Sequence, residues 1–250
     1  MPLLEFDAER LAKVEPALTQ PYVDAPVAAV ACFFSDIVAD WAKDGEPILE
    51  LPGQEQLWEV ERDGKRLAVF FPGMGAPLAA CRLERVIAAG CRAVVACGGA
   101  GALTPELEMG HHVITVTAAV RDEGTSYHYL PPARLVEAQP DVAAVLADIA
   151  ELRGEPHLTG ITWTTDAYFR ETSHRVARRY AEGCITVEME AAALLAVAQF
   201  RGVRFGQYLY AGDDLTGDSW DHREWWESPR RRDLADLAAE AALALCASEI

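Results

Sequence analysis

Two carboxylates open an otherwise apolar stretch of the chain, and their placement needs a chemical reason. They stand in Val187-Glu188-Met189-Glu190, directly ahead of the run Ala191 to Leu195. Acidic residues favour a helix N-terminus because of the helix dipole, which is the structural explanation. A buried carboxylate also needs hydrogen-bond partners, since burial without them is costly. Sugar hydroxyls would be such partners, so Glu188 and Glu190 predict either a helix start or a sugar-binding site.

A second pair of carboxylates, Asp213 and Asp214, ends the last apolar segment of strand character. Adjacent acids at such a place often serve as helix caps. A partly buried carboxyl there can instead carry and donate a proton near neutral pH, and Gly212 leaves room for a flat ligand. A calcium loop is not indicated, because the spacing of the acids that follow and the missing bidentate Glu do not fit one.

Glycines surround a predicted junction between a strand and a helix, at Gly73-Met74-Gly75-Ala76-Pro77. The segment has the outline of a dinucleotide-binding fingerprint. Its sixth position is Leu78, however, and Pro77 removes one amide, so a nicotinamide site is disfavoured. Gly73 and Gly75 still allow an anion to approach the backbone at a helix N-terminus. A simple tight turn is the alternative.

A second glycine run, Gly98-Gly99-Ala100-Gly101, closes a buried strand candidate. Glycines at this density expose N–H groups and admit a ligand against the main chain. No Gly-Lys-Ser/Thr follows, so the run is not a nucleoside triphosphate loop. By itself it indicates close approach and no particular ligand.

The histidines and cysteines do not predict a metal. His128 belongs to a polar stretch, Arg121 to Tyr129, which we expect to form a surface loop; it is either a loop residue or a general base. His111 and His112 have no carboxylate or cysteine at ligand spacing. The six cysteines form no Cys-x-x-Cys pair, as is typical of small buried hydrophobes in a reducing compartment.

Short apolar strand candidates alternate with longer helix candidates. The expected strands are 28–34, 67–71, 93–97, 113–120, 158–165 and 203–210, and the expected helices are 77–89, 140–152, 189–200 and one capped by Ser228-Pro229 and running to 246. This alternation predicts one α/β domain over residues 1–250, with helices on both faces of a sheet. Ligands of such folds gather at the carboxyl ends of strands, and the segments above fall there.

The charge balance bears on partners. The formal net charge is −17, from 39 acidic and 22 basic residues. Such a field repels nucleic-acid phosphates within a Debye length of roughly 10 Å, so nucleic acid is not an expected partner. The chain shows no signal-peptide core and no run of about 18 apolar residues, so no membrane partner is expected and the predicted location is the cytoplasm.

Taken in order, these segments resemble the nucleoside phosphorylase family, which includes uridine phosphorylase and the hexameric purine nucleoside phosphorylases. The resemblance runs from about Leu67 to Leu215. Its most specific part is Val187-Glu188-Met189-Glu190, because the family carries the same Val-Glu-Met-Glu stretch. It implies a three-layer α/β/α fold with a mixed central sheet. It also implies that Met189 lies under a ribose and that Glu190 grips the ribose hydroxyls, with Glu188 counted in the same substrate-binding set.

The base and phosphate subsites follow from the same resemblance. Thr164-Thr165-Asp166-Ala167-Tyr168 is similar to a Ser-Ser-Asp-x-Phe stretch whose aromatic ring stacks on the base, which implies this role for Tyr168. Gly212-Asp213 falls where the purine enzymes carry the acid that protonates the purine, so Asp213 is the candidate catalytic residue. Gly73 to Pro77 is similar to the family's Gly-Ile-Gly-x-Pro turn, and Gly98 to Leu103 to its Gly-Thr-Thr-Gly-Ala-Ile loop.

The chain also departs from the family pattern. The phosphate-binding Arg and Thr of the family are replaced by Ala96 and Gly99, and its N-terminal Gly-Asp-Pro-x-Arg segment is not recognisable. The Gln and Arg that select pyrimidines are replaced by Thr172 and His174, so uridine specificity is not supported. Phosphate would then bind backbone amides, helped by an Arg. The expected anion-binding residues are Gly73, Gly75, Gly98, Gly99 and an Arg such as Arg121 or Arg170.

The predicted activity is phosphorolysis of the N-glycosidic bond of a nucleoside, with a purine preferred. The products are the free base and ribose 1-phosphate, so the enzyme is a pentosyltransferase that needs no cofactor besides inorganic phosphate as co-substrate. Two alternatives remain open: a nucleosidase that uses water on the same scaffold, and a catalytically silent nucleoside-binding protein. The resemblance further implies a homo-oligomer, either a dimer or a hexamer.

Overall fold

A mixed sheet of ten strands organises the computed structural model, which describes residues 2–108 and 110–247. The strands are β1 (Ala28–Cys32), β2 (Glu46–Leu51), β3 (Glu55–Arg62), β4 (Lys65–Phe70), β5 (Ala93–Ala102), β6 (Val113–Asp122), β7 (Leu135–Glu137), β8 (His157–Thr165), β9 (Cys184–Glu188) and β10 (Arg204–Asp214). Their order is β10-β6-β8-β9-β5-β1-β4-β3-β2, with β7 beside β6. β10 also pairs with β5, which closes β5, β9, β8, β6 and β10 into a ring.

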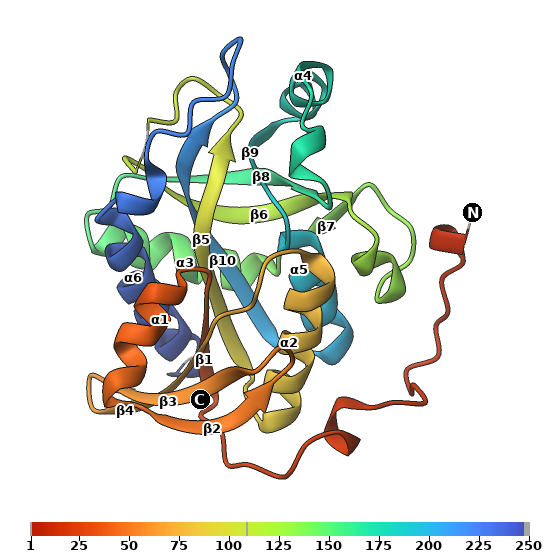
Figure 1. The fold of residues 1–250 in the computed structure, drawn as a ribbon, viewed down its shortest axis with the longest axis vertical. Helices are drawn as coiled ribbons and strands as arrows, with labels where there is room; N and C mark the ends of the chain where they lie inside the picture. The colour runs from red at the N-terminus through yellow and green to blue at the C-terminus, as the bar shows by residue number, and fades with distance from the viewer. Residues whose placement is uncertain (1, 109, 248–250) are drawn as a thin grey trace.

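Helices cover both faces of this sheet. They are α1 (Ser35–Trp41), α2 (Ala76–Ala89), α3 (Pro140–Leu152), α4 (Ser173–Ala181), α5 (Ala191–Arg201) and α6 (Arg230–Ala247). α2 and α5 pack side by side on one face, and α1, α3 and α6 lie on the other (Figure 1). The three-layer α/β/α arrangement expected from the sequence is confirmed.

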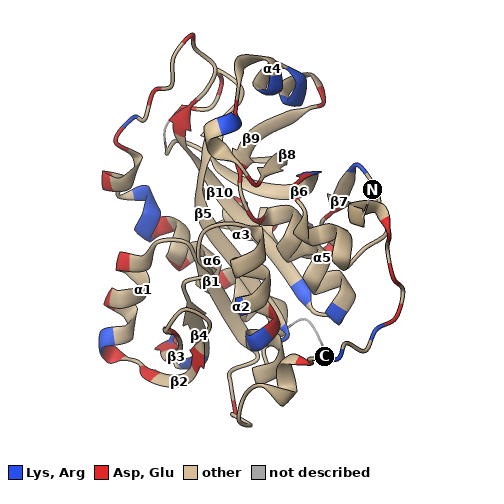
Figure 2. Ribbon diagram, turned by 45° about the vertical axis from the view of Figure 1, so that its right-hand side comes forward, with Lys and Arg blue, Asp and Glu red and all other residues tan. Residues whose placement is uncertain are grey.

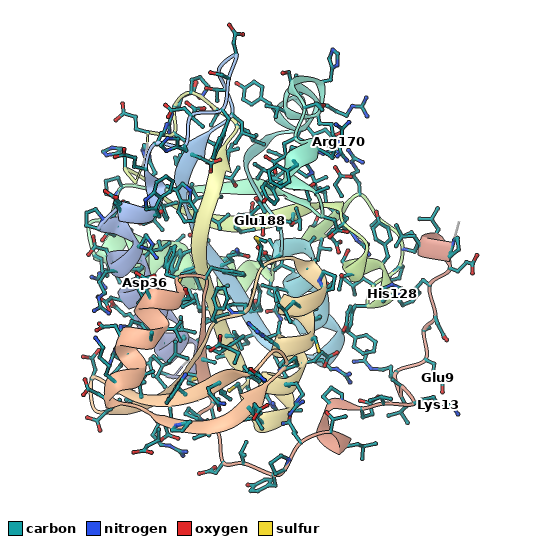
Figure 3. All side chains as sticks on the ribbon, in the orientation of Figure 1. Glu9, Lys13, Asp36, His128, Arg170 and Glu188 are labelled. Atoms are coloured by element: carbon teal, nitrogen blue, oxygen red, sulfur yellow. The ribbon has the colours of Figure 1, made fainter. Side chains whose placement is uncertain are left out.

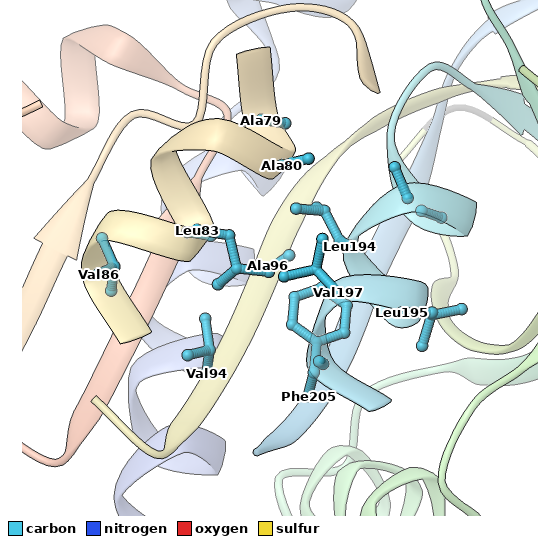
Figure 4. Close-up of a cluster of buried hydrophobic side chains, with 14 of the residues drawn as sticks. Ala79, Ala80, Leu83, Val86, Val94, Ala96, Leu194, Leu195, Val197 and Phe205 are labelled. Atoms are coloured by element: carbon cyan, nitrogen blue, oxygen red, sulfur yellow. The ribbon is translucent and has the colours of Figure 1, made fainter. Parts of the chain in front are cut away.

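The core beneath α2 and α5 is built from small and branched side chains (Figure 4). Leu83 of α2 and Leu194 of α5 meet Val94 of β5 there, and all three are fully buried. α5 is so rich in alanine that its backbone can approach both α2 and the sheet closely. Because burial of one Leu or Val side chain contributes about 1.5–3 kcal/mol, this layer fixes the position of the α5 N-terminus firmly.

Local signals set the ends of α2 as expected. Pro77 occupies the first turn, and Gly90 ends the helix with a φ of 125° that few other residues adopt. The helix begins one residue earlier than the sequence suggests, at Ala76. The expected strand 93–97 is longer, because β5 continues through the glycine run to Ala102. The glycines therefore lie in a paired strand and do not form a loop after it.

A hairpin and four short elements, α1, β7, α4 and β9, have no counterpart in the expected elements. β2 and β3 pair antiparallel, and their turn places Gly53 and Gln54 at positive φ. Both strands mix acidic with apolar residues because one face is exposed at the sheet edge, which hides the strand signal. The strand β9 is short, and α4 carries three Arg among its nine residues.

The outer surface shows an extended arm and an uneven charge distribution. Residues 2–27 carry two short 3-10 turns and run along the outside of α2 and α5 (Figure 1). Acidic residues are spread widely, whereas Arg residues gather on α4 and at the start of α6 (Figure 2). Among the described helices, none is long and apolar enough to cross a membrane.

Candidate active site

The end of β9 and the start of α5 bring the predicted segments together. β9 runs antiparallel to the end of β5, and Val187 pairs with Gly101. The next residue, Glu188, therefore lies beside the glycine run of β5, near the centre of the molecule (Figure 3). The chain then passes through Met189 and Glu190, so α5 begins two residues later than expected.

Glu188 caps the N-terminus of α5. Its Oε2 accepts the backbone N–H groups of Glu190 at 2.7 Å and Ala191 at 2.6 Å. Its Oε1 accepts the hydroxyl of Thr164 at 2.6 Å, and the same hydroxyl accepts the N–H of Ala192 at 3.0 Å. The carboxylate is thus satisfied from within the protein, as the helix-start explanation predicts.

Glu190 joins two segments that are far apart in sequence. Its Oε1 accepts the backbone N–H of Gly75 at 2.6 Å, and its Oε2 accepts that of Met189 at 3.3 Å. Gly75, with a φ of 91°, precedes the first turn of α2. The carboxylate therefore lies at the N-terminus of α2, where an anion is favoured. One of the amides expected to bind phosphate already has an acceptor in this arrangement.

Burial changes the protonation of both glutamates. Glu188 and Glu190 are 8% and 6% exposed. Loss of solvent raises the pKa of Glu188 to about 7 and that of Glu190 to about 8, with the charge of Glu188 adding to the second shift. The hydrogen bonds that both carboxylates accept act in the opposite direction. The pair therefore holds a proton near neutral pH, and Glu190 is the member whose carboxyl can still exchange its partners for a polyhydroxyl ligand.

The two adjacent acids at the end of β10 have different surroundings. Asp214 forms an ion pair with Arg223 and accepts the N–H of Thr216 at 2.8 Å. Loss of solvent raises the pKa of Asp214, but these contacts outweigh that effect, so its pKa is lowered. Asp213 instead accepts the indole N–H of Trp220 at 2.7 Å. Asp214 is therefore ionised and holds the following segment in place, whereas Asp213 makes fewer contacts that stabilise the fold.

Glu171 is a site residue that sequence reasoning missed. It follows the 3-10 turn Tyr168–Arg170, and its N–H donates to Tyr168 O at 3.1 Å. Burial, together with the smaller effect of the nearby charge of Asp213, raises the pKa of Glu171 to about 7. The only available signal was an acid three positions beyond the predicted base-stacking aromatic. Tyr168 itself is 44% exposed and contacts Phe169 with ring centroids 3.9 Å apart.

The two glycines expected to admit a flat ligand lie against an indole of the same chain. Gly99 pairs with Tyr210 across β5 and β10. A methyl group added at Gly99 would lie 3.6 Å from Trp225 Cε3, and one added at Gly212 only 3.1 Å from Trp225 Cβ. Gly98 faces Phe33 in the same way, at 3.2 Å. The glycines indicate close approach as predicted, and Trp225 is the flat group at Gly99 and Gly212.

The cations expected to assist anion binding lie elsewhere. Arg121 is 4% exposed, and its Nε and Nη1 donate to Ser126 Oγ at 2.8 Å and Pro131 O at 2.7 Å. Its guanidinium also lies 4.0 Å from the ring centre of Tyr127, and burial lowers the pKa of Arg121. Arg121 therefore stabilises its own loop. Arg170 is exposed near α4 (Figure 3).

A different arginine lies behind the glycine turn. Arg82 of α2 is 5% exposed and donates to Pro52 O at 3.0 Å and to Phe71 O at 2.9 Å. A methyl group added at Gly73, whose φ is 84°, would lie 3.0 Å from its Nη1. Its hydrogen bonds within the described chain go to carbonyl oxygens and to no carboxylate, and burial lowers the pKa of Arg82. The turn thus has an unpaired positive charge beside it.

A hollow of about 1010 Å³ lies away from these groups. The arm lines one side of it, and α2 and the Thr125–His128 turn line the other. None of the described carboxylates Glu188, Glu190 and Asp213 borders it, so the chemistry is not centred there. In residues 2–108 and 110–247, no group of three or more His, Cys, Asp and Glu side chains is placed to hold a metal ion.

Comparison with known proteins identifies the class. A sequence profile described as "Phosphorylase superfamily" matches residues 28–248, so the chain belongs to that superfamily. Its relatives include nucleoside phosphorylases. Guanosine phosphorylase of Halorubrum lacusprofundi is 29% identical over 192 residues, covering 74% of this chain and 79% of the relative. Uridine phosphorylase of Salmonella typhimurium is 30% identical over 163 residues, covering 60% and 64%.

Solved structures share the fold. Purine nucleoside phosphorylase of Toxoplasma gondii superposes with a TM-score of 0.78 at 20% identity, over 89% of this chain and 92% of the other. Uridine phosphorylase of Vibrio fischeri superposes with a TM-score of 0.75 at 20% identity, over 88% and 93%. The resemblance to the nucleoside phosphorylase family that the sequence motifs indicated is confirmed.

Proposed function

We propose that the chain transfers the ribosyl group of a nucleoside to inorganic phosphate, releasing a free base, with purine nucleosides preferred. The observation that carries the proposal is the bond between the buried Glu190 carboxylate and the Gly75 amide. It brings the family's Val-Glu-Met-Glu stretch and the glycine turn at the start of α2 to one point. Membership of the phosphorylase superfamily supports phosphorolysis of a nucleoside.

The ribose would lie over Met189 and bind Glu190. Met189 is half-buried between the two glutamates, so its thioether can offer an apolar surface to the sugar ring. Glu190 can accept hydrogen bonds from the ribose hydroxyls, and Glu188 would act on the sugar only through its hold on the α5 N-terminus.

The base would lie between Tyr168 and Asp213. As the bond between the base nitrogen and ribose C1′ breaks, its electron pair goes to the base. A proton from the carboxyl of Asp213 to a purine nitrogen then neutralises the leaving group. General acid catalysis of this kind contributes about 10²–10⁴ in rate. Glu171, which holds a proton near pH 7 beside Asp213, supports this assignment because it can resupply one. The match to guanosine phosphorylase supports a purine.

Phosphate would bind at the glycine turn before α2. The N-terminus of this 14-residue helix favours an anion, and Gly73 and Gly75 take the positive φ values of the turn that precedes it. Gly98 and Gly99 of β5 lie against Phe33 and Trp225 instead, so they are not part of this proposed phosphate site. Arg82 supplies positive charge behind the turn in the place of Arg121, whose donors are engaged in its own loop. A phosphate oxygen then attacks C1′ of a ribosyl group with cationic character.

We also propose that the active protein is a homo-oligomer in the cytoplasm. The arm exposes Leu11, Val14 and Leu18 by 77%, 69% and 79%. Apolar side chains in such number on one extended segment are typical of a surface that a second copy covers. Size-exclusion chromatography with light scattering should give a mass above the 27.2 kDa of one chain.

The test of the activity is release of free base from a panel of purine and pyrimidine nucleosides, with and without phosphate. We expect release only with phosphate, together with ribose 1-phosphate. Asp213→Asn should lower kcat by at least about 10², whereas Asp218→Asn, at an exposed acid of the same segment, should not. Release without phosphate would replace the proposal by a nucleosidase, and binding without release by a silent nucleoside-binding protein. The second outcome would fit the loss of the family's phosphate ligands at Ala96 and Gly99.

A further inference from the structure

Asp213, the acid proposed to contact the purine base, already accepts a hydrogen bond from an indole. Trp220 Nε1 lies 2.7 Å from Asp213 Oδ2 and donates its proton to it. The other oxygen, Oδ1, faces the sheet, because a methyl group added at Gly101 would lie 3.4 Å from it. Oδ2 is therefore the oxygen that points away from β5, and Trp220 occupies it.

The backbone on both sides of Trp220 is fixed. Asp214 and Asp221 exchange two backbone hydrogen bonds, from Asp214 N to Asp221 O at 2.8 Å and from Asp221 N to Asp214 O at 3.1 Å. Arg223 ties the same stretch to Asp214 and to Leu107 O. The two ends of the loop that carries Trp220 are therefore held together.

The side chain of Trp220, in contrast, can rotate once its hydrogen bond to Asp213 breaks. It is 64% exposed, and its aromatic contact is with His222, at 5.8 Å between ring centres and 57° between ring planes. Exposed side chains change rotamer in picoseconds to nanoseconds, so rotation of the indole is no kinetic barrier to binding. A fixed loop with a mobile ring is the arrangement expected of a side chain that exchanges one partner for another.

We propose that Trp220 is a positioning residue for Asp213, whose indole N–H holds Oδ2 toward the base subsite and gives up this hydrogen bond to the purine when a nucleoside binds. The inference rests on the proposed function, since it takes Asp213 to be the group that contacts the base. An indole N–H donates and cannot accept. It therefore orients the carboxylate, and on binding the purine takes the place of the indole at Oδ2.

The exchange predicts a measurable change in affinity. Trp220→Phe keeps an aromatic ring and removes the N–H, so nucleoside no longer has to displace a hydrogen bond. We expect the Kd for guanosine and inosine to fall by about two- to tenfold, the range that one net hydrogen bond corresponds to. We also expect kcat to fall, because the carboxylate is no longer held in place. Trp226→Phe is the matched control, since Trp226 lies in the same segment and stacks on His222.

The indole resonance of Trp220 gives a direct readout. In a proton–nitrogen correlation spectrum of the whole protein, this peak is identified by its loss in Trp220→Phe. Guanosine should move it away from its hydrogen-bonded position, while the Trp226 peak shifts less. A stationary Trp220 peak at saturating guanosine, or an unchanged or larger Kd in Trp220→Phe, would overturn the inference. If equilibrium dialysis detects no binding of any nucleoside, the proposed function fails first and independently.

Discussion

Replacing Glu190 by Gln should change how the stability of the protein depends on pH. Both buried glutamates have an ordinary pKa of 4.5, and burial raises the pKa of Glu188 to about 7 and that of Glu190 to about 8. Between about pH 5 and 7 the folded pair therefore holds protons that the unfolded chain has lost. Stability must then fall as the pH rises through this window, and below about pH 4.5 the effect vanishes because both states are protonated.

The magnitude follows from the number of protons retained. Each retained proton gives a slope of about 1.4 kcal/mol per pH unit, or about 3 kcal/mol over two units. Gln at position 190 still accepts the N–H of Gly75 through its amide oxygen but cannot ionise. The variant should therefore gain about 3 kcal/mol on the wild type between pH 5 and pH 7.

Urea unfolding at pH 5, 6 and 7 measures this difference directly, because other titrating groups are common to both proteins and cancel. Glu151→Gln, at an exposed position of α3, is the control and should follow the wild type. Parallel curves for the wild type and Glu190→Gln would refute the reasoning, since they would mean that Glu190 ionises as easily in the folded protein as in the unfolded chain.

Three further changes test other parts of the site. Thr164→Val removes the hydroxyl that bridges Glu188 and the start of α5, and should lower the free energy of unfolding by about 1–3 kcal/mol in urea. Gly212→Ala places a methyl group 3.1 Å from Trp225 Cβ and should cost about 1–3 kcal/mol, against less than about 0.5 kcal/mol for the exposed Gly217→Ala. The pKa of Glu171 is raised to about 7. If the reaction needs the neutral form of Glu171, kcat/KM should decline above about pH 7. Glu171→Gln should lack that decline, and superimposable pH profiles would exclude Glu171 from the reaction.

The sequence predicts the apolar framework well because its signals are local. Pro77 and Gly90 bound α2 through their own backbone preferences, and the uninterrupted apolar run of α5 could only be buried. The hairpin of β2 and β3 is different, since its exposed face carries charge and its stability comes from pairing with β4. The pairing of the hairpin with another strand cannot be predicted from the short segment of sequence that forms it.

The candidate site is predicted in part for a similar reason. Glu190 is identifiable because a carboxylate ahead of an apolar helix needs a partner, but the partner, the N–H of Gly75, lies 115 residues away. Gly99 and Gly212 predict that something approaches the backbone, and only the fold shows that Trp225 does so. The burial of Arg82 is likewise a result of packing. Arg82 lies in a helix with other charged residues, so its type and spacing alone do not mark it as buried.

One amide links the two halves of the proposed reaction. The N–H of Gly75 donates to Glu190 at 2.6 Å, and a phosphate at the N-terminus of α2 needs the same donor. When ribose hydroxyls donate hydrogen bonds to Glu190, its carboxyl group no longer depends on the N–H of Gly75. That N–H can then donate to phosphate at a lower free-energy cost. Because coupling between two sites is reciprocal, nucleoside must raise phosphate affinity by the factor by which phosphate raises nucleoside affinity. Calorimetric titrations of each substrate with and without the other would show this equality, whereas independent binding would place the phosphate away from Gly75.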